Sequence, residues 1–202
     1  MILTKRFEEA LIYSSLVHAG QRRKGTEIPY ISHLLAVASI VLEHEGSEDE
    51  AIGALLHDAV EDAGGKTRLE DIRCRFGDVV ARIVDGCSDT DIIPKPPWKE
   101  RKQKYIEHVR VASPSVRLVS ASDKLHNAQA ILRDYRELRE TLWDRFNAPR
   151  DDILLYYRSL VQAFRDTAAI QRVSRAKRGR PAGPYPRSRR RRQHYLLRPV
   201  HL

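Results

Sequence analysis

The chain has 202 residues, of which 42% are hydrophobic and 31% charged, which suffices for one folded domain around a single core. Eleven of the 36 basic residues and no acidic residue lie in 171–202, so residues 1–170 carry 25 basic against 27 acidic residues. The net charge of +9 therefore belongs to the end of the chain, which excludes a uniformly basic nucleic-acid-binding body, and no apolar run approaches the ~18–20 residues of a membrane span.

Helical periodicity dominates the first 170 residues and alternating strand patterns are scarce, which predicts an all-α fold. The segment 48–63 is predicted as one continuous helix, because apolar residues recur on one of its faces. The prolines in 88–97 exclude a helix there and predict a long loop. The expected helices cover about 4–19, 30–44, 48–63, 67–76, 78–87, 98–110, 114–132, 136–144 and 150–169.

Two helix starts have recognisable capping residues. Thr67 and Glu70 have the spacing of a capping box, and Ser113 followed by Pro114 is a typical N-cap with proline in the first turn. The segment 171–202 is rich in Arg, Pro and Gly and has too few apolar residues to fold. The sequence therefore predicts one domain over 1–170 and a disordered basic tail over 171–202.

The two cysteines, Cys74 and Cys87, have no metal-binding spacing, and the amino-terminal residues do not resemble a secretion signal. Neither a disulfide framework nor a zinc finger is expected. A reducing, cytoplasmic location fits these features best.

A metal site is indicated first by the adjacent pair His57 and Asp58, since imidazole and carboxylate groups can bind one divalent ion together. On a helix they would lie opposite the apolar face, together with Glu61 and Asp62. Gly53 and its neighbour Ala54 leave room for another element or a ligand to approach, so the pair is predicted to be buried.

His33 and Asp123 complete the predicted site. His33 lies in register with apolar residues, where a histidine alone is more often an ordinary core residue. Asp123 lies on a helix that is apolar on both sides, and a buried carboxylate needs a partner or a cation. Two His and two Asp ligands suit manganese, iron or another divalent ion better than structural zinc, and such a site indicates hydrolysis.

Five segments in this order, 18–24, 29–33, 57–62, 76–77 and 123–127, carry a family resemblance. They resemble the HD-domain metal phosphohydrolases, and more narrowly the hydrolase domain of RelA/SpoT-type proteins and the small alarmone hydrolases, over roughly 5–170. The resemblance implies an HD-domain bundle of about eight to nine helices. It also implies removal of the 3′ pyrophosphate of (p)ppGpp, usually with Mn²⁺.

Carried over by motif, the resemblance implies three groups of site residues. Glu61 and Asp62 would orient the nucleophile or move its proton, the alternative being a solvated helix end. Arg23 and Lys24 would contact phosphate or stack on a base, the alternative being a solvated basic loop. The metal ligands would be His33, His57, Asp58 and Asp123, and Asn127 would join the substrate contacts.

Two alternatives for function stay open. The segment 86–91 and Ala130 depart from the usual pattern of the alarmone hydrolases, so the same site could act on another nucleotide or phosphate ester. The tail 171–202 could bind nucleic acid weakly and without sequence preference, or it could be a solvated extension. The sequence predicts no oligomeric state.

Overall fold

The computed structural model describes residues 2–88, 94 and 96–166, and this part of the chain is helical without a strand. Arg22 and Pro29 form one isolated β-bridge at the base of a loop. The all-α prediction is confirmed. In chain order the elements are α1 (Lys5–Val17), α2 (Ile31–Glu43), α3 (Glu48–Leu56), α4 (Ala59–Asp62), α5 (Gly65–Phe76), α6 (Asp78–Cys87), α7 (Trp98–Val111), α8 (Pro114–Leu138), the 3₁₀ helix η1 (Arg139–Arg145) and α9 (Arg150–Arg165).

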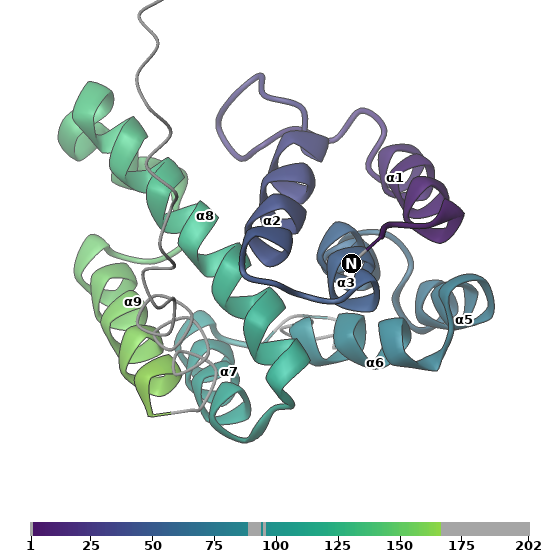
Figure 1. Ribbon diagram of the computed structural model, residues 1–202. Helices are drawn as coiled ribbons and strands as arrows, with labels where there is room; N and C mark the ends of the chain where they lie inside the picture. Colours follow the sequence, from purple (N-terminus) through teal and green to yellow (C-terminus); the bar gives the residue numbers. More distant parts are fainter. Residues whose placement is uncertain (1, 89–93, 95, 167–202) are drawn as a thin grey trace, which may run out of the picture.

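The long helix α8 crosses the molecule between two groups of helices (Figure 1). α2, α3 and α6 pack on one side of it, and α7 and α9 on the other. The larger core lies within the first group and includes the fully buried Leu55 and Val84, while Val109 and Leu160 belong to a smaller core between α7 and α9. Side chains of α8 therefore face a space that both groups enclose.

The segment predicted as one helix over 48–63 is broken in the structure, which corrects that prediction. α3 ends at Leu56, and α4 begins at Ala59 after a turn at His57 and Asp58. Consecutive residues of a continuous α-helix point about 100° apart, because the helix has 3.6 residues per turn. The turn re-aims both side chains toward the same centre, as shown below.

The start of α5 also differs from expectation. The helix begins at Gly65, two residues before Thr67, so Thr67 lies inside it and the predicted capping box is not formed. The structure places a capping box at the start of α3 instead. There the Ser47 hydroxyl accepts from the Glu50 backbone N–H at 3.3 Å, and the Glu50 carboxylate accepts from the Ser47 N–H at 2.7 Å.

Ser113 caps α8 as predicted, since its hydroxyl accepts from the Val116 N–H. The helix continues to Leu138, beyond the expected end near 132, and Arg139 with φ of 53° ends it. The short helix predicted over 136–144 is thus divided between the last turn of α8 and η1.

Gly53 allows the close approach that the sequence predicted. A Cβ atom at this position would lie 2.6 Å from Cγ2 of Ile83 on α6. Real side chains do not tolerate such a distance, so only glycine lets α3 and α6 pack at this spacing. Because α3 leads directly into His57, this contact also fixes where the candidate site begins.

Several predictions lie outside the described residues. They concern most of the loop 88–97, the end of the last helix beyond 166, and the basic tail 171–202. The division into 1–170 and 171–202 therefore stays a prediction. Among the helices that the structure describes, none combines the length and the low polarity needed to span a bilayer.

Candidate metal centre and substrate cavity

The structure brings the four predicted metal ligands together. His33 comes from the first turn of α2, His57 and Asp58 from the turn between α3 and α4, and Asp123 from the middle of α8. One ligand atom from each of the first three residues lies within 4.8 Å of the others. Asp123 completes the cluster, since its Oδ1 lies 3.2 Å from His33 Nε2 and 3.7 Å from His57 Nε2.

The ring nitrogens of both histidines have complementary roles. His57 Nδ1 donates to the backbone carbonyl of Ala54 at 2.8 Å, so a neutral His57 ring would carry its lone pair on Nε2. That Nε2 lies 3.0 Å from Asp58 Oδ2, and His33 Nε2 lies 3.7 Å from the same oxygen. His33 Nδ1 is paired with His126 Nδ1 at 2.7 Å. Each histidine is thus held by one nitrogen and presents the other to the centre.

The donor set fits a divalent cation. The Nε2 atoms of His33 and His57 are buried and make no hydrogen bond with a described residue, although carboxylate oxygens lie close to both. Buried polar atoms are normally satisfied. The two unsatisfied ring nitrogens face the carboxylates of Asp58 and Asp123. An ion bound by all four groups would satisfy these nitrogens, and its charge would balance the two carboxylates.

The electrostatics of the cluster favour this arrangement. Burial would raise the pKa of Asp123, but the adjacent Lys124 ammonium together with His33 and His57 outweighs this effect and holds this pKa well below its usual range. Burial, together with the charges of His33 and Arg23, lowers the pKa of His126 to about 4, so its ring is neutral at neutral pH. The carboxylates therefore stay anionic, and His126 can pair with His33 without a second buried positive charge.

Hydrogen bonds also hold both carboxylates in place. Tyr30 Oη donates to Asp58 Oδ2 at 2.6 Å, and Lys124 Nζ donates to Asp123 Oδ2 at 2.6 Å. The amide of Asn127 donates to Asp123 Oδ1. Partners of this kind orient metal-binding groups before the ion arrives.

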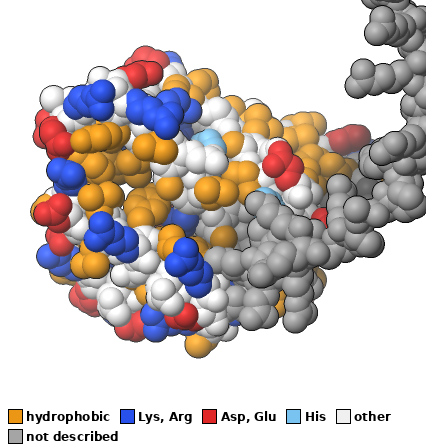
Figure 2. Space-filling model, turned by 60° about the vertical axis from the view of Figure 1, so that its left-hand side comes forward, with side chains coloured by type: hydrophobic (Ala, Val, Ile, Leu, Met, Phe, Trp, Pro, Cys, Tyr) orange, Lys and Arg blue, Asp and Glu red, His pale blue; other side chains and the backbone are white. Residues whose placement is uncertain are grey.

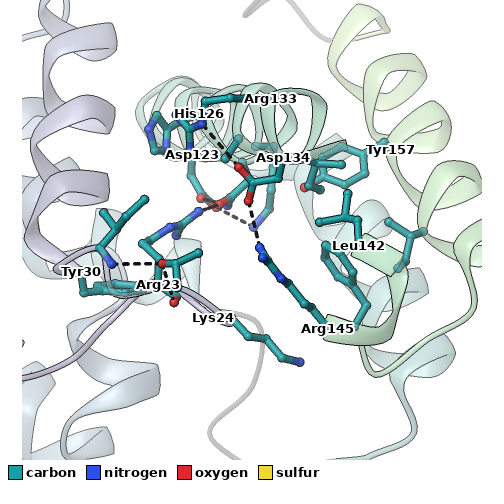
Figure 3. Close-up of a pocket in the computed structure, with 18 of the residues that line it drawn as sticks. Arg23, Lys24, Tyr30, Asp123, His126, Arg133, Asp134, Leu142, Arg145 and Tyr157 are labelled. Atoms are coloured by element: carbon teal, nitrogen blue, oxygen red, sulfur yellow. Dashed lines mark hydrogen bonds and ion pairs between the residues drawn. The ribbon is translucent and has the colours of Figure 1, made fainter. Parts of the chain in front are cut away.

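A cavity of about 600 Å³ opens beside the cluster and includes Asp58 and Asp123 in its lining. The predicted substrate residues Arg23, Lys24 and Asn127 all lie in its wall, where Arg23 donates to Asn127 Oδ1 at 2.6 Å. Figure 3 shows Arg23 and Lys24 reaching in from the loop before α2, opposite Arg145 from η1. The volume lies in the ~300–1,000 Å³ range of small-molecule sites.

Much of this cavity could not be predicted from the sequence. Its further basic residues are Lys102, Lys124, Arg133 and Arg145, and aromatic side chains from α7 and α9 and that of Phe146, directly after η1, also line it. Lys124 lies within the segment 123–127 that carries the family resemblance, and this is the one signal in the sequence for these additional residues. The others come from separate elements, so no local spacing relates them to His57.

Glu61 and Asp62 do not line the cavity. They occupy the short α4, and Asp62 Oδ2 accepts from Gln21 Nε2 at 2.8 Å. Gln21 in turn pairs with His18, whose ring stacks on Tyr30 with 5.2 Å between centroids. Asp62 is therefore linked through Gln21 and His18 to Tyr30, the partner of Asp58, and the catalytic role of both acids stays a prediction.

The structure is thus a helical bundle with a buried His/Asp cluster at the floor of a basic cavity. Comparison with known proteins identifies the class of proteins to which this arrangement belongs. The family model described as "HD domain" matches residues 10–154. The chain therefore belongs to the HD-domain family. Within that family it is of the RelA/SpoT type, on the similarity to the relatives described next.

The chain is 38% identical over 138 residues to the mouse protein named guanosine-3′,5′-bis(diphosphate) 3′-pyrophosphohydrolase MESH1, covering 67% of this chain and 72% of the relative. The Drosophila melanogaster protein of the same name is 33% identical over 167 residues, covering 81% and 87%. A solved structure of a metazoan SpoT ortholog, described as hydrolysing ppGpp, superposes with a TM-score of 0.67 at 26% identity, covering 89% of this chain and 98% of the other.

Proposed function

We propose that this protein is a metal-dependent phosphohydrolase that removes the 3′ pyrophosphate of guanosine-3′,5′-bis(diphosphate). The observation that carries the proposal is the cluster of His33, His57, Asp58 and Asp123 at the floor of a strongly basic cavity. The similarity to proteins named for this activity supports the choice of substrate. Water would add to the phosphoryl group at the 3′ oxygen and release pyrophosphate and GDP.

The four cluster residues would hold one divalent ion, and we propose Mn²⁺ because the donor set mixes nitrogen and oxygen. When bound, such an ion would polarise a phosphoryl oxygen and lower the pKa of a coordinated water. Lys124 and Tyr30 would keep the carboxylates of Asp123 and Asp58 in place. Arg23 and Lys24, together with Arg145 across the cavity, would neutralise substrate phosphates.

A substrate panel tests the proposal. The purified full chain with Mn²⁺ would be assayed against ppGpp, GTP, nucleoside 3′- and 5′-monophosphates and p-nitrophenyl phosphate. Release of pyrophosphate and GDP from ppGpp in preference to the other compounds is the expected result. A different preferred nucleotide would replace the proposed substrate, and inactivity toward every phosphate ester would refute the hydrolase.

Binding of the ion should be measurable without activity. Because the cluster is preformed in the folded state only, Mn²⁺ should raise the thermal unfolding temperature of protein pretreated with chelator. At 100 times Kd the stabilisation is about 2.7 kcal/mol, which corresponds to roughly 5–10 °C for a domain of this size. Differential scanning calorimetry with and without Mn²⁺ checks this, and an unchanged unfolding temperature would contradict the proposed ligand set.

Arg23→Gln should raise KM for ppGpp more than it lowers kcat. The guanidinium lies 5.6 Å from the Tyr30 ring centroid and contacts Asn127 at the cavity wall. A lost charge-assisted contact is worth about 1.5–3 kcal/mol, or about 10–100-fold in kcat/KM. Arg22→Gln is the matched control, because Arg22 pairs with Glu27 and does not line the cavity. Equal effects of both variants would argue against a substrate contact.

Glu61 and Asp62 are proposed to orient the attacking water or to move its proton. Glu61→Gln and Asp62→Asn remove the charge while keeping the shape of the side chain. If one of them is the general base, that variant should lose about 10²–10⁴-fold in kcat and keep its stabilisation by Mn²⁺. Glu70→Gln on the exposed side of α5 is the control, and unchanged kcat in both variants would leave these acids without a catalytic role.

A further inference from the structure

A second cavity, of about 690 Å³, lies between the outer sides of α8 and α9. Its wall is mainly apolar, with Leu132 from α8 and Leu154 and Val161 from α9. Leu132 is 53% exposed and Val161 47% exposed, so these side chains are not covered by another described element. Figure 2 turns this side of the molecule forward and shows hydrophobic side chains interspersed with Lys and Arg side chains.

Positive charge lies along the α9 side of this groove. Arg150, Arg158 and Arg165 belong to its lining and recur along one side of α9. Arg150 lies 3.4 Å from Glu140, but Arg158 and Arg165 form no ion pair with another described residue. No Asp or Glu is among the residues that line the groove. An apolar surface beside unpaired arginines is complementary to a molecule that is apolar and carries an acidic group.

Trp143 provides an independent indication of a ligand. This η1 residue lines the groove, and its Nε1 is buried without a hydrogen-bond partner among the described residues. A buried indole N–H normally finds an acceptor. Neighbouring contacts do not supply one, since Tyr135 and Phe146 meet the indole through their rings, with centroids 6.0 Å and 5.8 Å away. The lining of the groove therefore includes a residue with a hydrogen-bond donor that no described residue satisfies.

We propose that the groove between α8 and α9 binds an amphipathic anion, with an apolar body along Leu132, Leu154 and Val161 and an acidic head group at Arg158 and Arg165. The site is distinct from the substrate cavity but adjoins it. Ile131, Ile153 and Tyr157 line both cavities and so form the wall between them. A ligand in the groove therefore contacts the same side chains that bound the proposed substrate.

The two tryptophans allow a direct test, because Trp98 lines the substrate cavity and Trp143 lines the groove. In the full chain carrying Trp98→Phe, Trp143 is the remaining fluorophore. Dodecanoate, kept below its micelle concentration, should change its emission in a saturable way with one molecule bound per chain. In the Trp143→Phe variant, the emission of Trp98 should respond much less.

Two comparisons distinguish a site that selects anionic ligands from nonspecific binding of apolar molecules. Arg158→Glu and Arg165→Glu should each weaken dodecanoate binding at least about tenfold, whereas Arg82→Glu, an exposed control on α6, should not. Dodecyltrimethylammonium, with the same chain and the opposite charge, should bind markedly more weakly than dodecanoate. Absence of saturable binding, equal binding of both amphiphiles, or unaffected binding in both arginine variants would each overturn the proposal. None of these measurements uses hydrolysis, so the proposed function is tested separately.

Discussion

Asp58→Ala should lower pyrophosphate release from ppGpp by at least about 10³-fold, equivalent to about 4 kcal/mol in the activation free energy. Asp58 Oδ2 is the oxygen nearest to His57 Nε2, at 3.0 Å, and it also faces His33 Nε2 at 3.7 Å. Its loss removes one of the two charges that would balance a divalent ion. Changes to the partners of metal ligands already cost about 10–100-fold, so loss of a ligand itself should cost more.

The readout needs to separate lost catalysis from lost folding. The variant should keep its helical circular dichroism and unfold cooperatively, but it should no longer be stabilised by Mn²⁺. Asp85→Ala is the matched control, since Asp85 is exposed on α6 and belongs neither to the cluster nor to the lining of the substrate cavity. Near-normal turnover by the Asp58 variant, with retained Mn²⁺ stabilisation, would show that this carboxylate does not hold the ion.

Leu55→Ala should lower the free energy of unfolding by about 2–5 kcal/mol, the usual cost of emptying a fully buried leucine site. Leu55 has no exposed surface and belongs to the core that joins α3 to its neighbours. It also stands two residues before His57, at the end of the helix that positions the metal cluster. The packing of α3 therefore stabilises the fold and also positions His57, a proposed metal ligand.

Urea denaturation followed by circular dichroism, in metal-free buffer, measures this change without a contribution from ion binding. Leu155→Ala is the control, because Leu155 is 61% exposed on α9, and exposed substitutions usually change stability by less than about 0.5 kcal/mol. If the two leucine variants were equally stable, the assigned core of α3 would be wrong.

Local patterns in the chain were sufficient for most of the helices and for the four residues that the structure brings together as a candidate metal site. The 3.6-residue periodicity predicted α1, α2 and α6 nearly to their ends, because an amphipathic helix encodes its own buried face. Asp123 was recognisable because a carboxylate on a helix that is apolar all round requires a partner. The break at His57 and Asp58 was missed, since the periodicity continues across it and only the geometry of the cluster requires a turn.

Neither the substrate cavity nor the groove beside it could be predicted in this way. The linings include Lys102, Arg145 and Trp143, which come together only when α7, η1 and α9 pack around α8. The spacing of these residues along the chain does not indicate that they are close in space. The sequence by itself determined the helices and which residue types could bind an ion, because both depend on neighbours within a few turns. Tertiary structure decided how charges from distant helices gather around the candidate metal site, because this depends on how the helices pack against one another.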